Sequence, residues 1–193
     1  MPRLVAIPGS LRAGSFNGHL ARAMAARAPS GTTIEVASIA GIPLYDGDDE
    51  AKNGIPAPVT ALKEKVASSD GVLLVSPEYN SGIPGVMKNA IDWMSRPPQD
   101  MARIFKGKPV GIVGATPGPA GTRLAQTAWL PVLRTLGMMP WFGAALYVDS
   151  AAKVLDEQGE LVDPKTEERI RTYVEGFAAF AATLVKGHAA STS

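Results

Sequence analysis

The sequence contains no cysteine among its 193 residues. This absence excludes disulfides, thiolate metal ligands and thiol redox chemistry within the chain, so any redox role has to come from a cofactor. Histidine is also scarce: the chain has His19, in a predicted helix, and His188, near the end of the sequence. We expect both to be structural or solvated.

The chain has no strong excess of either charge and no long hydrophobic run. Lys and Arg number 19, Asp and Glu 18, and the net charge of +1 comes without a basic arm. We therefore expect no nucleic-acid surface. The acidic cluster Asp46, Asp48, Asp49 and Glu50 predicts a solvated loop in preference to a metal site, and we expect no metal.

The longest apolar stretch, residues 138–148, contains Pro140 and has about half the ~20 residues that a membrane span needs. The amino terminus has no basic segment followed by a long apolar segment and a cleavage site. We therefore expect a cytoplasmic protein without membrane insertion.

The composition, 46% hydrophobic and 19% charged residues, is ordinary for one globular domain. We predict a single domain over residues 1–186 and a frayed tail over residues 187–193. Apolar strand patterns are predicted over residues 3–8, 33–39, 71–76, 109–115 and within 138–148. Helical patterns are predicted over residues 17–28, 58–68, 85–95 and 120–136, and after Asp163 as a cap.

Pro131 predicts a kink or break of the fourth helix near residues 128–130. Alternating strands and helices indicate right-handed crossovers and a parallel sheet covered on both faces. The fold class is therefore α/β: a flavodoxin-like, doubly wound, five-stranded parallel sheet of order 2-1-3-4-5 with helices on both faces. In this topology ligands bind beyond the carboxyl ends of the strands, in the crevice between the first and third strands.

A loop from Gly9 to Asn17 joins the first strand to the first helix, and it has the features of a phosphate site. A helix that starts there directs free N–H groups and its positive dipole end at one spot. Ser10, Ser15 and Asn17 can add neutral donors, and Arg12 can add a forked cationic one. The glycine spacing fits neither a dinucleotide nor a triphosphate loop, which favours a mononucleotide. An ordinary helix cap with a solvated arginine is the alternative.

The loop after the third strand, residues 76–85, is dense in turn residues and contains Tyr79. Its prolines and glycines can shape a backbone that meets the heteroatoms of a flat polar ring, and Tyr79 offers a face for that ring. A plain turn with an exposed tyrosine is the alternative.

Several segments together resemble the NADPH-dependent FMN reductase family, in particular its bacterial chromate or quinone reductase branch. The resemblance covers essentially the whole domain and is strongest from Leu4 to Arg96. The segments that carry it are Gly9-Ser10-Leu11-Arg12, Ser15-Phe16-Asn17, Ile42-Pro43-Leu44-Tyr45-Asp46, Pro77-Glu78-Tyr79-Asn80, Pro84-Gly85, Lys88-Asn89-Ala90-Ile91-Asp92-Trp93 and Ser95-Arg96.

The resemblance implies FMN as cofactor and NADPH or NADH as hydride donor. It implies that the FMN phosphate is held by Ser10, Arg12, Ser15, Phe16 and Asn17. It also implies that the isoalloxazine ring is lined by Pro77, Glu78, Tyr79, Asn80, Thr116 and Gly118. At position 78 we expect the backbone amide to matter more than the carboxylate. Ser81-Gly82 stands where family members carry an aromatic residue, which leaves the wall over the ring more open.

With FMN bound, the flavin N5 carries the hydride and no catalytic side chain is required. The resemblance thus implies a ping-pong transfer of two electrons to quinones, flavins, azo compounds or metal ions and oxyanions such as chromate. It also implies a homotetramer or, failing that, a dimer. Arg123 is open to two interpretations, the extra phosphate of NADPH or a subunit contact. The aromatic residues Trp93, Trp141 and Phe142 fit contact surface or core.

A flavodoxin-type electron carrier with the same fold and cofactor is the main alternative. Such carriers tend to be strongly acidic, and a net charge of +1 does not supply that field. A response-regulator receiver has the same topology, but it needs acidic residues after the first and third strands, where this chain has Pro8-Gly9 and Ser76-Pro77.

Overall fold

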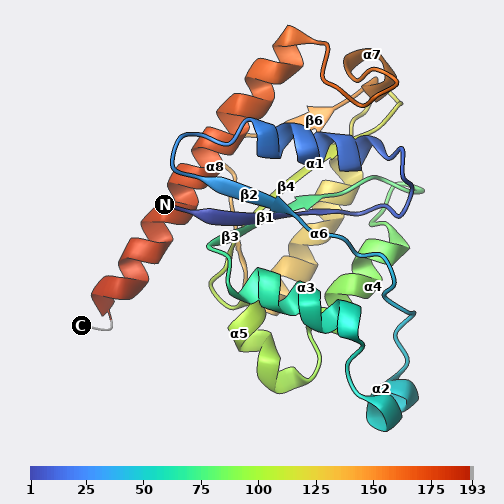
Figure 1. Cartoon of the computed structure of the whole chain (residues 1–193), viewed down its shortest axis with the longest axis vertical. Helices are drawn as coiled ribbons and strands as arrows, with labels where there is room; N and C mark the ends of the chain where they lie inside the picture. The colour runs from blue at the N-terminus through green and yellow to red at the C-terminus, as the bar shows by residue number, and fades with distance from the viewer. Residues whose placement is uncertain (192–193) are drawn as a thin grey trace.

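The computed structural model describes the backbone of residues 1–191 and the side chains of residues 1–184. Within this range the chain forms a six-stranded parallel sheet in which β2, β1, β3, β4 and β5 are neighbours in that order and β6 also pairs with β4 (Figure 1). The strands are β1 (Arg3–Pro8), β2 (Thr33–Val36), β3 (Gly71–Val75), β4 (Pro109–Ala115), β5 (Met139–Pro140) and β6 (Leu146–Val148).

Helices cover both faces of the sheet, as predicted. They are α1 (Phe16–Ala26), α2 (Gly47–Asn53), α3 (Ala57–Ala67), α4 (Gly85–Met94), the 3₁₀ turn η1 (Pro98–Asp100), α5 (Met101–Phe105), α6 (Arg123–Leu136), α7 (Ala151–Val154) and α8 (Pro164–Ser191).

Two apolar layers form the core, one on each side of the sheet. Alternate residues of β1 separate them: Leu4 and Ala6 pack with α1 and α8, whereas Val5 and Ile7 pack with α3, α4 and α6. The side chains of β3 are buried throughout, as its unbroken run of Val and Leu predicts for a strand covered on both faces. The hydrogen-bonded neighbours in the sheet confirm the predicted strand order 2-1-3-4-5.

The fifth strand was predicted as one segment, and the structure divides it into β5 and β6. The chain stops pairing with β4 after Trp141. The ring of Trp141 packs edge-on against the ring of Tyr173 in α8, with the ring centroids 4.9 Å apart. A Cβ atom at Gly143 or Gly176 would come within 2.6 or 2.8 Å of that ring. The indole of Trp141 thus fills the space next to β4, and the chain pairs with β4 again at β6.

A kink or a break was predicted in the fourth helix; the break is wrong, because α6 is continuous across Pro131, and the kink stays a prediction. Proline removes one helical hydrogen bond, and both Pro131 and Thr127, whose carbonyl loses its donor, are exposed to solvent. Water can therefore replace the missing partner.

The cap of the last helix is confirmed: Asp163 Oδ2 accepts a hydrogen bond of 2.8 Å from Thr166 N–H.

The acidic cluster forms the short helix α2, where a solvated loop was predicted. Asp46 is its N-cap and accepts from Asp48 N–H at 2.9 Å, while the other acidic residues fill the first turn. Carboxylates at this position interact favourably with the helix dipole. In the sequence, the several acidic residues next to Gly47 were the feature that could have indicated a helix start.

The frayed tail predicted for residues 187–193 falls on the end of the chain whose side chains lie outside the described residues. None of the helices described for this chain has the length and apolar character needed to cross a membrane.

Candidate flavin site

The first loop connects β1 to α1 at the carboxyl edge of the sheet. Ser15 is the N-cap of α1, and its hydroxyl accepts from Gly18 N–H at 3.4 Å. The N–H groups of Phe16 and Asn17 belong to the first helical turn, so they have no partner within the helix. Gly9 lets the loop pass close to α4, since a Cβ there would lie 2.5 Å from Met87 Sδ. The loop therefore offers an anion the end of a helix.

Arg12 lies exposed beside this helix end. Its backbone N–H donates to Ser10 Oγ at 3.3 Å, and its guanidinium makes a contact of 3.5 Å with the carbonyl of Gly14. A guanidinium with such a weak internal contact keeps its donors available for a phosphate.

Asn17 is buried, and its side chain pairs with Ala115. Its Nδ2 donates to the carbonyl oxygen of Ala115 and its Oδ1 accepts from Ala115 N–H, both at 2.9 Å. This pair uses one of the two Nδ2 hydrogens and gives the amide a structural role, and its use for a phosphate stays a prediction. The backbone N–H of Asn17 remains directed out of the helix end.

The second loop follows β3 and is shaped by a tight turn. Tyr79 and Gly82 exchange backbone hydrogen bonds, and the two residues between them, Asn80 and Ser81, have φ angles of 49° and 59°. Two successive positive φ values are typical of a type I′ turn. The turn presents Tyr79, which is 48% exposed and whose hydroxyl lies 3.5 Å from Ser10 Oγ. The first and second loops thus meet at these side chains.

Glu78 points away from the turn and toward the start of α6. Its Oε2 accepts hydrogen bonds from the N–H groups of Leu124 and Ala125, at 2.9 and 3.0 Å. The carboxylate therefore caps a helix, and the backbone of Glu78 is what the loop leaves available at the cleft.

The third loop leaves β4 at Thr116. Its N–H donates to the carbonyl of Val148, and its hydroxyl accepts from Gly118 N–H at 3.4 Å. Further along, Arg123 begins α6 and holds its guanidinium 4.9 Å from the centre of the Tyr147 ring. This cation–π contact lies within the chain, and the two roles considered for Arg123 stay predictions.

The three loops line one cleft of about 70 Å³. It contains all the predicted site residues except Asn80 and Gly118, each of which lies one position beyond a lining residue. The lining consists of Ser10, Arg12, Ser15, Phe16, Asn17, Pro77, Glu78, Tyr79, Ala115, Thr116 and Pro117.

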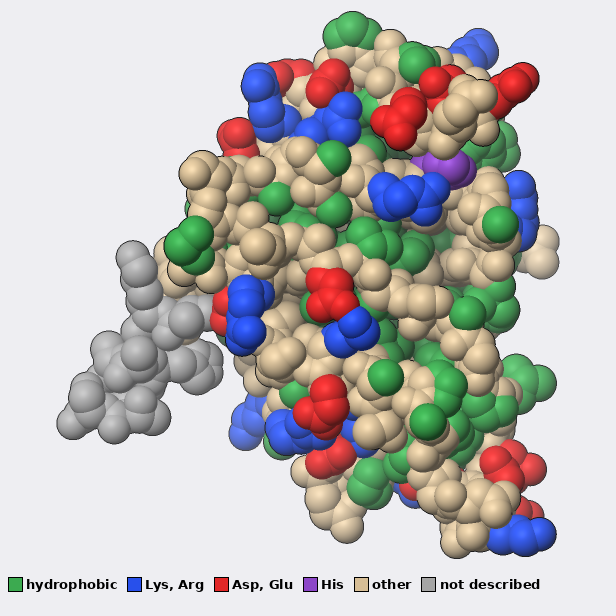
Figure 2. All heavy atoms as spheres, viewed as in Figure 1, with side chains coloured by type: hydrophobic (Ala, Val, Ile, Leu, Met, Phe, Trp, Pro, Cys, Tyr) green, Lys and Arg blue, Asp and Glu red, His purple; other side chains and the backbone are tan. Residues whose placement is uncertain are grey.

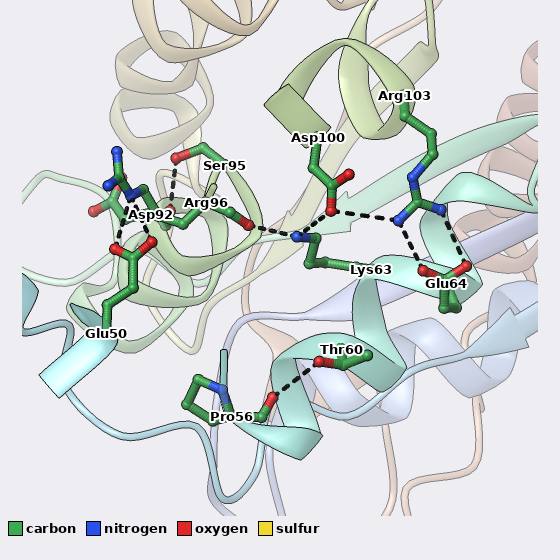
Figure 3. A network of polar contacts seen from close by, with 10 residues as sticks. All are labelled: Glu50, Pro56, Thr60, Lys63, Glu64, Asp92, Ser95, Arg96, Asp100 and Arg103. Atoms are coloured by element: carbon green, nitrogen blue, oxygen red, sulfur yellow. Dashed lines mark hydrogen bonds and ion pairs between the residues drawn. The ribbon is translucent and has the colours of Figure 1, made fainter. Parts of the chain in front are cut away.

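A network of charged residues, shown in Figure 3, braces the segment that follows α4. Lys63 of α3 is buried although it is charged. It contacts the carbonyl oxygen of Arg96 and, at 2.7 Å, Asp100 Oδ2. Arg103 pairs with Glu64 through hydrogen bonds of 2.8 and 3.1 Å. The network connects α3 to η1 and α5.

The same network reaches α2. Arg96 Nε donates to both oxygens of Glu50, at 2.9 and 3.2 Å, and holds the pKa of that carboxyl below its ordinary value. Tyr45 donates to the same carboxylate, and this hydrogen bond raises the pKa of the phenol. Nothing in the sequence pattern distinguished Glu50 from its acidic neighbours. Among the residues that the structure describes, no group of His, Asp or Glu side chains could hold a metal ion.

Comparison with known proteins identifies the kind of site that the cleft represents. The sequence model of a family described as NADPH-dependent FMN reductase matches residues 2–153. The chain belongs to this family. An NAD(P)H-dependent FMN reductase from Pseudomonas aeruginosa is 39% identical over 173 residues, which cover 90% of this chain and 91% of the relative. A quinone reductase from Escherichia coli K12 is 39% identical, with coverage of 92% and 94%.

A solved structure shares both the fold and the sequence. The NAD(P)H:acceptor oxidoreductase FerB from Paracoccus denitrificans is 31% identical, with a TM-score of 0.84 and coverage of 95% of this chain and 98% of that one. Membership of the NADPH-dependent FMN reductase family makes the chain an oxidoreductase with FMN as cofactor and NAD(P)H as electron donor. The donor set of the cleft fits that cofactor, because it offers an exposed guanidinium and a helix N-terminus for a phosphate.

Proposed function

We propose that this chain is an FMN-dependent NAD(P)H oxidoreductase that reduces quinones by a ping-pong mechanism. The observation that carries the proposal is the convergence of three loops, from β1, β3 and β4, on one cleft at the carboxyl edge of the sheet. In a doubly wound sheet the crevice at this edge is where nucleotides bind.

In this proposal the first loop holds the phosphate of FMN. Arg12 supplies the charge, the hydroxyls of Ser10 and Ser15 supply short donors, and the N–H groups of Phe16 and Asn17 supply the helix end. This assignment is supported by the exposure of Arg12 and by the direction of the helix start.

The second and third loops are proposed to line the ring, through Pro77, Tyr79 and Asn80, the backbone of Glu78, and the small residues Thr116 and Gly118. N–H groups directed at the ring edge stabilise the negative charge that develops when the ring is reduced. These residues would hold FMN, which would supply the two-electron chemistry between a nicotinamide and a second substrate. The exposed Tyr79 offers a face for flat substrates.

Quinones are the acceptors that we propose first. Relatives named quinone reductase and 2-hydroxy-1,4-benzoquinone reductase, the latter 35% identical, support this choice. Free flavins are a second class, and chromate is proposed as an incidental acceptor. We further propose that the protein works in the cytoplasm as a homotetramer or a dimer, with the 73% exposed Phe142 in a subunit contact.

A flavodoxin-type carrier is the second candidate, because it would use the same cleft. Figure 2 shows Lys and Arg side chains interspersed with Asp and Glu over one face of the molecule, in keeping with the net charge of +1. A carrier that docks on basic partners works best with an acidic surface. The charge distribution therefore favours the enzyme.

An anaerobic titration tests the proposal. The protein is reconstituted with FMN, and its visible spectrum is followed as NADPH and then a benzoquinone are added. We expect NADPH to bleach the flavin band and the quinone to restore it. A bound flavin that dithionite reduces and NADPH does not would indicate the carrier, and a protein that binds no FMN would contradict both functions.

A further inference from the structure

Glu78 joins one of the loops that line the cleft to helix α6. Its backbone belongs to the loop after β3, whereas its carboxylate lies at the start of α6, 46 residues further along the chain. Both hydrogen bonds, from Leu124 and Ala125, end on the same oxygen, Oε2. One oxygen atom of the Glu78 side chain therefore connects the loop after β3 to the start of α6.

Helix α6 has no such partner of its own. Thr122, at the N-cap, makes no capping hydrogen bond, and its hydroxyl accepts instead from Gln126 Nε2 at 3.1 Å. The first turn contains no acidic residue and begins with Arg123. A helix start with free N–H groups needs an acceptor, and Glu78 supplies it from another loop.

We propose that Glu78 is a positioning residue for the flavin site. Its side chain anchors the loop after β3 to α6, and this anchor sets the place of the backbone N–H group of Glu78. The effect on flavin binding rests on the proposed function, whereas the anchor itself rests on the contacts with Leu124 and Ala125. The carboxylate is not a ligand of the flavin in this proposal.

Two substitutions separate the anchor from the charge. Glu78→Gln keeps the length of the side chain and one acceptor oxygen but loses the charge. Glu78→Asp keeps the charge but is one methylene shorter, so it does not reach both N–H groups. If the anchor matters, the Gln variant resembles the wild type and the Asp variant does not; if the charge matters, the order is reversed.

The first measurement uses the protein without FMN. Amide hydrogen exchange at Leu124 and Ala125, followed by NMR, reports the anchor directly. We expect both amides to remain protected in the Gln variant and to exchange at least tenfold faster in the Asp variant. Equal exchange in the wild type and the Asp variant would overturn the anchor, whether or not the protein binds FMN.

The second measurement is the affinity for FMN, from quenching of flavin fluorescence. We expect about tenfold weaker binding by the Asp variant, in the range of ordinary coupling between linked sites, and binding within about twofold of wild type by the Gln variant. Asp163→Ala is the matched control, because it removes the acidic cap of α8, outside the cleft. Equal FMN affinity in all variants, or a loss shared with the control, would overturn the positioning role.

Discussion

Asn17 and Ala115 form a closed pair of hydrogen bonds at the base of the cleft. The side-chain amide donates to the carbonyl and accepts from the N–H of one residue, with both distances at 2.9 Å. Both residues are buried, each 3% exposed. This pair fastens the first turn of α1 to the end of β4, where the third loop begins, and Glu78 fastens the second loop to the start of α6, where the third loop ends.

Replacing Asn17 tests the strength of this pair. Asn17→Ala leaves a buried N–H and a buried carbonyl of Ala115 without partners, which costs about 2 to 4 kcal/mol of unfolding free energy in the protein without FMN. Urea denaturation measures the change. Asn53→Ala is the control, because it removes a side-chain hydrogen bond to Asp49 on the surface of α2 and should cost less than about 0.5 kcal/mol. Equal losses in the two variants would show that the buried pair has no special weight.

Replacing Arg12 tests the phosphate assignment. Arg12→Ala should weaken FMN binding by roughly ten- to a hundredfold, because a charge-assisted hydrogen bond contributes ~1.5 to 3 kcal/mol. The unfolding free energy of the protein without FMN should hardly change, since the guanidinium's contact with Gly14 is 3.5 Å long. Fluorescence titration with FMN is the measurement.

Arg22→Ala controls for a general effect of positive charge. Arg22 lies on α1, the helix that follows the loop of Arg12, and is also exposed, but its guanidinium contacts His19 Nδ1 at 2.8 Å. FMN affinity should stay within about twofold of wild type, as expected for a surface charge screened by solvent. An equal loss in the two variants would indicate a diffuse field in place of a phosphate site.

The fold and the meeting of the first two loops could be predicted from the sequence because local patterns determine both. The buried run of β3, the alternating faces of β1 and the cap at Asp163 are each encoded within a few residues. Strand ends in a parallel sheet then bring distant loops to one edge. The patterns therefore predicted a cleft whose lining contains Ser10 and Arg12, and the family resemblance added Thr116 of the third loop.

What could not be predicted are the contacts between residues far apart in the chain. The pattern of α3 places Lys63 beside other charged residues, and only the position of Asp100 and of the Arg96 carbonyl makes its burial favourable. The use of Glu78 and Asn17 as connectors likewise depends on where α6 and β4 lie. Residue type identified these two as polar groups of the site but not what they bind.

The stability of the protein should fall in acid through the network of Figure 3. Lys63 hydrogen-bonds to Asp100 and holds the pKa of that carboxyl below its ordinary value of 3.8. A carboxyl with a lowered pKa in the folded protein stabilises it above the ordinary value, and this contribution is lost as the pH falls. Urea midpoints should therefore drop as the pH falls through 3.8.

Lys63→Met should make this drop shallower, because the main cause of the lowered pKa at Asp100 is removed. Lys65→Met is the matched control: Lys65 lies on the same helix but pairs with Glu35 at the surface, 41% exposed. Its pH profile should run parallel to that of the wild type. A Lys63→Met profile parallel to the wild type as well would contradict the role of the Lys63–Asp100 pair.

Gly114 lets the backbone of β4 lie very close to Ser76 and Thr122 near the site. Adding one carbon atom at this position should disrupt that packing. A Cβ atom would lie 2.2 Å from the carbonyl oxygen of Ser76 and 2.2 Å from Thr122 Oγ1, which ties β4 to both neighbouring loops. Gly114→Ala should therefore cost about 3 kcal/mol of unfolding free energy, at the upper end for overpacking. Gly85→Ala, where a Cβ atom meets no atom within 4 Å, should be neutral or slightly stabilising in the same urea titration. If both variants unfold alike, β4 can move away from Ser76 and Thr122 without loss, and the close approach at Gly114 does not stabilise the fold.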